Sequence, residues 1–194
     1  MKEIILNILQ DSLETKEQFI KDNLDLIQQG ADSLATCITS GHKIMIFGNG
    51  GSAADAQHIA AEFVNRFQVE RAPLAGLALT TDTSVITSIA NDYHFDQIFS
   101  KQIQALGKKD DIAIGISTSG GSKNVIQAIH AAKDIGIFTM GLMGRGGELA
   151  QCADLAFRVE SDITARIQEA HITLGHILCD LAERILFPEE YYHG

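Results

Sequence analysis

Two segments rich in glycine and serine contain the residues best suited to binding a charged ligand. The first is Gly48-Asn49-Gly50-Gly51-Ser52, and the second is Ser117-Thr118-Ser119-Gly120-Gly121-Ser122. Each directly follows an apolar run and precedes a segment with helical character. At a junction of strand, turn and helix, free backbone N–H groups and the positive end of the helix dipole point at one place, which favours an anion. The two turns therefore predict a site for one phosphorylated ligand.

The second turn has more hydroxyl groups than an ordinary helix start requires. Four hydroxyls surround two glycines that let the backbone fold tightly, and they belong to Ser117, Thr118, Ser119 and Ser122. An N-cap needs one such side chain. Neither turn has the Gly-Lys-Ser/Thr ending of a Walker loop or the G-x-G-x-x-G pattern of a dinucleotide site. The pattern favours a small phosphorylated ligand over a nucleotide.

A second kind of chemistry is indicated by titratable residues after the first turn. His58 and Glu62 are four residues apart, so on a helix they share one face. Such a pair can bind a divalent metal ion or exchange protons, although a surface His–Glu pair without a function is more common. The last helical segment adds Gln168, His171 and His176, and isolated histidines there are more often packed or solvated than functional. From the residues alone, both interpretations stay open.

Apolar runs that alternate with helical patterns predict the elements that would position these residues. We expect buried strands of a parallel sheet at 43–48, 74–79, 111–116, 137–142 and 155–159. Helical patterns lie at 52–68, 83–107 (broken near Asn91), 122–135, 146–152 and from about Asp162 to Leu186. Residues 3–39 have helical spacing and form either one long helix or two shorter ones. The chain is therefore predicted to have an α/β fold.

Composition narrows the class of protein further. The chain has 194 residues, 45% of them hydrophobic, which fits one folded domain. A net charge of −10 argues against direct binding of nucleic acid. The three cysteines lack metal-type spacing, and the charged N-terminus resembles no signal peptide. With no apolar run near the ~20 residues that span a bilayer, we expect a cytoplasmic protein that does not bind membranes.

Three motifs together resemble the sugar isomerase (SIS) fold and, within it, the sedoheptulose-7-phosphate isomerases, also called phosphoheptose isomerases. They are residues 48–58, 116–120 and 164–171, the last being Thr-Ala-Arg-Ile-Gln-Glu-Ala-His. The resemblance implies a three-layer αβα SIS domain with a five-stranded parallel sheet and long terminal helices. It implies one domain over residues 1–194, with a helical segment of about 1–40 packing on it and in the oligomer. It also implies a homotetramer whose active sites use more than one subunit.

The same resemblance implies an activity and a set of site residues. The reaction would convert D-sedoheptulose 7-phosphate to D-glycero-D-manno-heptose 7-phosphate through an enediolate, for bacterial heptose and lipopolysaccharide biosynthesis. Glu62 would be the base and His176 the partner acid. One zinc ion per subunit would be held by His58, Glu62, Gln168 and His176. The implied substrate contacts are Asn49, Gly50, Gly51, Ser52, Glu62, Asn91, Asp92, Ser117, Thr118, Ser119, Ser122 and Gln168.

Spacing within the last helix adds an expectation about this metal site. Gln168 and His176 are eight residues apart, about 12 Å along a helix, so both reach one ion only with extended side chains. We therefore expect two subunits to share the site. The two roles implied for Glu62 also conflict, because a carboxylate that binds a zinc ion tightly is a weaker base.

Two other functions use the same fold. A branch of the family consists of replication-initiator-associating proteins, which this chain resembles around Cys179-Asp180-Leu181 and Leu186-Phe187-Pro188. That branch lacks the acidic residue at position 62 and the histidine at position 176, and this chain has both. Binding of a replication initiator is therefore the less favoured alternative. A sugar-phosphate sensor without turnover is the other.

Overall fold

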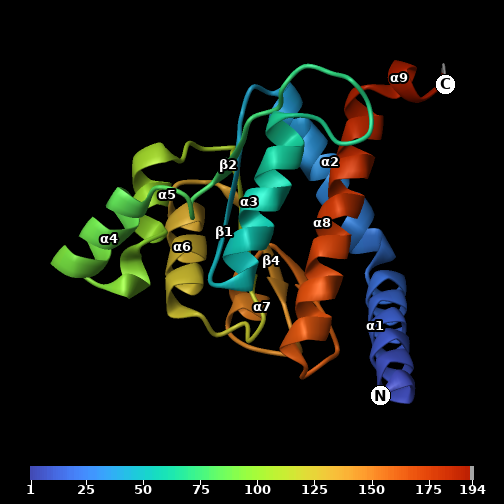
Figure 1. The fold of residues 1–194 in the computed structure, drawn as a ribbon. Coiled ribbons are helices and arrows are strands. Elements are labelled where there is room, and N and C mark those ends of the chain that lie inside the picture. The colour runs from blue at the N-terminus through green and yellow to red at the C-terminus, as the bar shows by residue number, and fades with distance from the viewer. Residues whose placement is uncertain (193–194) are drawn as a thin grey trace.

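The computed structural model describes residues 1–192, and its centre is a sheet of five parallel strands (Figure 1). The strand order is β2-β1-β3-β4-β5. The bounds are Ile44–Gly48 for β1, Gly76–Ala78 for β2, Ile112–Ser117 for β3, Phe138–Met143 for β4 and Leu155–Arg158 for β5. All residues of β1 and β3 are buried, which explains why their sequences are apolar without polar alternation.

Helices cover both faces of the sheet. On one face lie α2 (Leu24–Thr39), α3 (Gly51–Val64) and α8 (Thr164–Leu186), packed on the side chains of Ile44 and Ile46. On the other lie α5 (Ser100–Leu106), α6 (Lys123–Asp134) and α7 (Leu149–Cys152), packed on Met45 and Phe47. α4 (Thr83–Asp92) flanks this second layer. The predicted three-layer αβα fold with a five-stranded parallel sheet is confirmed.

The N-terminal segment forms two helices rather than one. α1 (Lys2–Asp22) ends at Asn23, whose buried side-chain amide donates to the carbonyl of Phe19. α1 runs beside α8 and then extends away from the body of the molecule (Figure 1). Its first turns expose many large apolar side chains, those of Met1, Ile4, Ile5, Leu6, Ile8, Leu9 and Leu13.

Several predicted boundaries differ from the observed ones. The helix expected over 52–68 ends at Val64, because the segment after it is held by side chains from elsewhere in the chain. The break expected near Asn91 is present: α4 ends at Asp92 and a 3₁₀ turn, Phe95–Gln97, leads to α5. The helix expected over 146–152 is one turn, Leu149–Cys152, because glycines occupy the residues before it. A final short helix, α9, spans Pro188–Tyr192.

The described residues contain no helix that combines the length and the apolar composition needed to cross a bilayer.

Candidate active site

The two glycine- and serine-rich turns lie side by side at the carboxyl edge of the sheet. They follow β1 and β3, which are neighbouring strands that pair Gly48 with Ile116. The side-chain amides of Asn49 and Asn124 join the turns by two reciprocal hydrogen bonds of 2.9 and 2.8 Å. The two motifs therefore form one continuous surface. Asn124 was not predicted from the sequence, because its role depends on the contact with Asn49, which is distant in the chain.

Hydroxyl groups of the second turn form hydrogen bonds within the turn, and the side chain of Ser122 does not cap the first-turn N–H groups of α6. The Oγ atoms of Ser117 and Ser122 are 2.8 Å apart, and the N–H of Gly121 donates to Ser119 Oγ at 3.2 Å. Ser122 is the N-cap residue of α6, yet its side chain makes no capping hydrogen bond. The first-turn N–H groups of α6 are thus not capped by that serine. This arrangement favours anion binding over simple helix capping.

Glycines let a third loop support the second turn. Gly120 and Gly147 have positive φ angles, +65° and +97°, and their backbones are in close contact. A Cβ atom on Gly147 would lie 2.3 Å from the carbonyl carbon of Gly120. Two hydrogen bonds complete the contact, from the N–H of Gly144 to the carbonyl of Thr118 and from the N–H of Leu149 to the carbonyl of Gly120, both 3.0 Å. The loop before α7 therefore fixes the shape of the hydroxyl-rich turn.

At the first turn, glycine makes room for a side chain from α8. Gly50 has a φ of +56°, and Gly51 begins α3. A Cβ atom on Gly51 would lie 2.4 Å from Nε2 of Gln168, so the amide of Gln168 rests on the start of α3. Ser52, directly after, is buried. Gln168 is therefore within reach of a ligand bound at the turns.

Two helical turns further along α3, three titratable side chains meet. The distance from His58 Nε2 to Glu62 Oε1 is 3.1 Å, and the distance from His58 Nε2 to His176 Nε2 is 3.0 Å. All three ligand atoms lie within 4.8 Å of one another. Helices α3 and α8 come close here because Gly175 has no side chain: a Cβ there would lie 2.7 Å from Ile59 Cδ1.

The donor atoms of this cluster suit a divalent cation. One proton on His58 Nε2 cannot bond well to both Glu62 and His176, whereas one cation can bind all three atoms. Ligands about 2.0–2.1 Å from a tetrahedral zinc ion lie about 3.3 Å from each other, close to the two distances measured from His58 Nε2. These three residues thus form a possible metal site.

The fourth predicted ligand lies elsewhere in the same chain. Gln168 contacts Gly51, which is seven residues before His58 and so about 10 Å from it along the axis of α3. The structure therefore brings together three of the four predicted metal ligands. The amide of Gln168 belongs instead with the first turn.

Asp55 adds an unusual carboxyl group one helical turn before His58. Its Oδ2 atom is buried and has no hydrogen-bond partner. Burial raises the pKa of Asp55 above its ordinary value, and the neighbouring His58 opposes the rise only in part.

The predicted contacts Asn91 and Asp92 lie on α4, beside the helix layer on the other face of the sheet from α3 and α8. They end α4 with exposed side chains, joined by a hydrogen bond of 2.8 Å between Asn91 Nδ2 and Asp92 Oδ1. In Figure 1, α4 lies on the opposite side of the molecule from α8. Within one chain, the structure does not bring these two residues to the His58–Glu62–His176 cluster.

Two further residues of the last helix, His171 and Arg166, are buried by packing within the chain. His171 is fully buried, so the packed interpretation fits it. Arg166 is also buried and donates to the carbonyl of Ile8 at 2.7 Å, which attaches α1 to α8.

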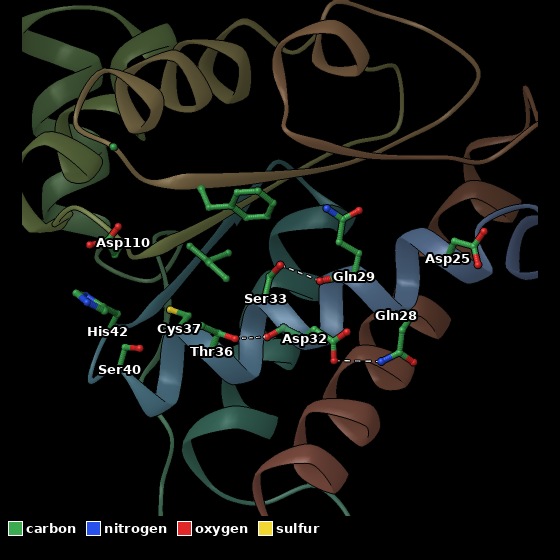
Figure 2. Close-up of a pocket in the computed structure, with 13 residues that line it drawn as sticks. Asp25, Gln28, Gln29, Asp32, Ser33, Thr36, Cys37, Ser40, His42 and Asp110 are labelled. Carbon is green, nitrogen blue, oxygen red and sulfur yellow. Dashed lines mark hydrogen bonds between the residues drawn. The ribbon is translucent and has the colours of Figure 1, made fainter.

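A large cavity lies away from all of these residues. It has a volume of about 680 Å³ and opens between α2 and the first residues of β3 and β4 (Figure 2). Its lining includes the exposed polar side of α2, with Asp25, Gln28, Asp32 and Thr36. None of the predicted site residues borders it.

The fold and the joined turns define a SIS-domain protein, and comparison with known proteins agrees. The sequence profile described as "SIS domain" matches residues 9–144. The phosphoheptose isomerase of Nitratidesulfovibrio vulgaris (Hildenborough) is 54% identical over 187 residues, which cover 96% of this chain and 90% of that protein.

Solved structures give the same result. A phosphoheptose isomerase from Neisseria gonorrhoeae is 43% identical, with a TM-score of 0.87 over 93% of this chain and 98% of that one. One from Francisella tularensis is 38% identical, with a TM-score of 0.90 over 94% of this chain and 97% of that one. The chain therefore belongs to the phosphoheptose isomerase family.

Proposed function

We propose that the protein is an aldose–ketose isomerase that converts D-sedoheptulose 7-phosphate to D-glycero-D-manno-heptose 7-phosphate. One observation carries the proposal: the carboxylate of Glu62 and the ring of His176 meet within 4.8 Å, on two helices that both start beside the joined turns. Relatives that are 54% and 55% identical in sequence and are named phosphoheptose isomerases support the same reaction.

Each part of the site has a role in this reaction. The joined turns bind the phosphate through N–H and hydroxyl groups. Glu62 takes the proton from one carbon and returns it to the next, while His176 exchanges a proton with the sugar oxygens. The weakly acidic carbon needs a stabilised oxyanion, and a bound divalent metal would supply that stabilisation as a Lewis acid.

The distances along α3 suit a seven-carbon sugar. His58 lies about 10 Å along the helix axis from Gly51, which is close to the length of an extended heptose phosphate. A phosphate at the turns would thus leave the reacting end of the sugar near Glu62. This spacing is the support for a heptose rather than a shorter substrate.

The proposal extends to the metal and the assembly. We assign one zinc ion per subunit to His58, Glu62 and His176. Gln168 would be the fourth ligand, either after its side chain moves away from Gly51 or from a second subunit. We also propose that residues 1–194 form one SIS domain, and that residues 1–40 pack on it and in a homotetramer. The apolar side chains exposed on α1 support this assembly. The place of α4, which carries Asn91 and Asp92, on the opposite side of the molecule from α8 supports sites shared between subunits. The expected location is the cytoplasm.

The test is turnover of the proposed substrate by the purified protein. Incubation with D-sedoheptulose 7-phosphate, with and without a chelator, is followed by chromatographic detection of heptose 7-phosphate. We expect product with metal and little after chelation. Binding of the sugar phosphate without formation of product would overturn the proposed isomerase activity and indicate a sugar-phosphate sensor. Capture of a replication initiator by a protein without turnover would indicate the initiator-binding alternative.

A further inference from the structure

The segment that follows α3, residues 65–73, is organised by one buried carboxylate. Glu183 on α8 is 1% exposed and accepts hydrogen bonds from three consecutive backbone N–H groups. These belong to Phe67 at 3.0 Å, Gln68 at 2.7 Å and Val69 at 3.2 Å. The hydroxyl of Tyr191 donates to the same carboxylate at 2.9 Å. A charged acceptor with this many donors fixes a loop more firmly than neutral contacts do.

A buried arginine completes the arrangement and reaches back to α3. Arg71 Nε donates to Glu183 at 2.8 Å, and both side chains are almost fully buried. The other end of the guanidinium group donates to backbone carbonyls, from Nη1 to Phe63 and from Nη2 to Glu62, both at 2.8 Å. The last carbonyls of a helix have no partner within the helix, so Arg71 caps α3 at the turn that carries Glu62.

The same loop also contacts His176. The ring of Phe67 stacks on the ring of His176, with centroids 5.6 Å apart and planes at 24°. The backbone N–H of Phe67 is one of the donors to Glu183. His176 and Glu183 are seven residues apart on α8, so they lie on the same side of that helix. One carboxylate therefore determines what packs against His176.

We propose that Glu183 is a positioning residue that fixes Glu62 relative to His176, through Arg71 on one side and Phe67 on the other. This inference rests on the proposed function of the cluster. Neither Glu183 nor Arg71 hydrogen-bonds to a side chain of the cluster, and Arg71 reaches Glu62 only at its backbone carbonyl. They act through the end of α3 and through the stacked ring, so their loss changes the geometry of proton transfer and metal binding rather than binding of the phosphate.

The charge of Glu183 is maintained by its surroundings. Burial by itself would raise the pKa of Glu183, but the N–H groups of Gln68 and Phe67 and the hydroxyl of Tyr191 outweigh it and lower that pKa. The carboxylate is thus ionised over the range in which enzymes work. Replacing it by an amide would turn one of the two acceptor oxygens into an NH₂ group, so the donors on that side would lose their acceptor.

The experiment compares three variants with a matched control. Glu183→Gln removes the carboxylate, Arg71→Lys keeps a charge beside Glu183 but lacks the fork that also reaches the carbonyl of Glu62, and Phe67→Leu removes only the stacked ring. The control is Glu70→Gln, in the same loop, where the side chain is 91% exposed and pairs with the half-exposed Arg66. All four are measured for turnover of D-sedoheptulose 7-phosphate and, in the apo-protein, for zinc affinity by competition with a chromophoric chelator.

We expect kcat and zinc affinity to fall by about 10- to 100-fold in Glu183→Gln and Arg71→Lys, the usual effect of losing a group that orients a metal ligand. KM for the sugar phosphate should stay within about two-fold, because the turns that bind phosphate lie at the other end of α3. Phe67→Leu should weaken both quantities less, and Glu70→Gln should match the unmodified protein. If Glu183→Gln does not fold, Arg71→Lys carries the test.

The outcomes separate this inference from the proposed function. Full kcat and zinc affinity in Arg71→Lys, with an active unmodified protein, would overturn the positioning role alone, since charge neutralisation of Glu183 would then be sufficient. Zinc affinity that falls in the variants of a protein without turnover would support the positioning role and overturn the reaction. A protein that neither isomerises the sugar nor binds zinc would overturn both.

Discussion

At the scale of single residues, the site brings one carboxylate and two imidazole rings together in a defined geometry. Glu62 and His176 come from different helices, and the His58 ring lies within hydrogen-bonding distance of both. A carboxylate and two imidazoles can exchange protons or share a cation at neutral pH. Which of these they do depends on what else enters the site.

Replacing Glu62 by Gln tests its role as the base. We expect turnover of D-sedoheptulose 7-phosphate to fall by about 10²- to 10⁴-fold, because an amide cannot accept the proton. Circular dichroism and size-exclusion chromatography should show an unchanged fold and assembly, since Glu62 is partly exposed. Turnover close to that of the unmodified protein would contradict the assignment.

Replacing Ser119 by Ala tests the hydroxyl-rich turn. Ser119 is exposed, and its Oγ accepts from Gly121 N–H, so it is available to a ligand. Phosphate binding is largely the same in the ground and transition states, so KM should rise by about 10-fold with little change in kcat. Steady-state kinetics would check this, with Ser40→Ala, far from the turn, as control. A loss in kcat alone would assign the turn a different role.

At the scale of elements, the site depends on how the loop after β4 supports the loop after β3. Gly147 has a φ of +97°, and a Cβ there would lie 2.3 Å from the Gly120 backbone, whereas a Cβ on Gly146 would meet nothing within 4 Å. Gly147→Ala should therefore strain the backbone by about 1–3 kcal/mol and displace the hydroxyl-rich turn.

The measurement for this pair is KM for the sugar phosphate together with the melting temperature. Gly147→Ala should raise KM and lower the melting temperature, while Gly146→Ala should leave both nearly unchanged. Equal effects of the two substitutions would show that the close approach to Gly120 does not shape the turn.

The elements themselves were largely predictable from the sequence, because buried strands of a parallel sheet must be apolar on both faces. Ile44–Gly48 and Ile112–Ser117 are visible as apolar runs for this reason. The turns were visible because glycine and hydroxyl residues follow those runs directly. Local sequence patterns therefore predicted the strands of the sheet and the two turns of the candidate site.

The remainder of the site depends on contacts between residues far apart in the chain. Glu183 and Arg71 are separated by 112 residues, and nothing near either one indicates a buried pair. The contact of Gln168 with Gly51 likewise depends on how α8 lies against α3. The assigned roles of Glu62, His176 and the predicted metal ligands stay predictions until activity and metal binding are measured.

At the scale of the whole molecule, a buried histidine makes stability depend on pH. Burial lowers the pKa of His171 from 6.5 to about 4. As pH falls through 6.5 the unfolded chain gains a proton that the folded chain does not take up until about pH 4. The free energy of unfolding should therefore decrease across this window, by up to about 3 kcal/mol in total.

Urea denaturation between pH 5 and 7 would measure this decrease, above the range in which carboxylates such as Glu183 are protonated. His171→Leu should flatten the dependence, because the unfolded chain then lacks that proton site. His130→Gln, which alters a half-exposed histidine, should keep the original slope. A slope unchanged in His171→Leu would assign the pH dependence to other groups.

The exposed side chains of α1 provide the test of assembly. Ile5 and Leu9 are 60% and 53% exposed, adjacent on one side of the helix, while the polar stripe of α1 contains Asn7. Apolar area buried on assembly stabilises it by roughly 25 cal/mol per Å², and a charge placed there is left without a partner. The double variant Ile5→Glu/Leu9→Glu should therefore dissociate the proposed homotetramer, whereas Asn7→Glu should not. Light scattering after size-exclusion chromatography gives the mass of each, and a tetramer that persists in the double variant would show that α1 does not hold the subunits together.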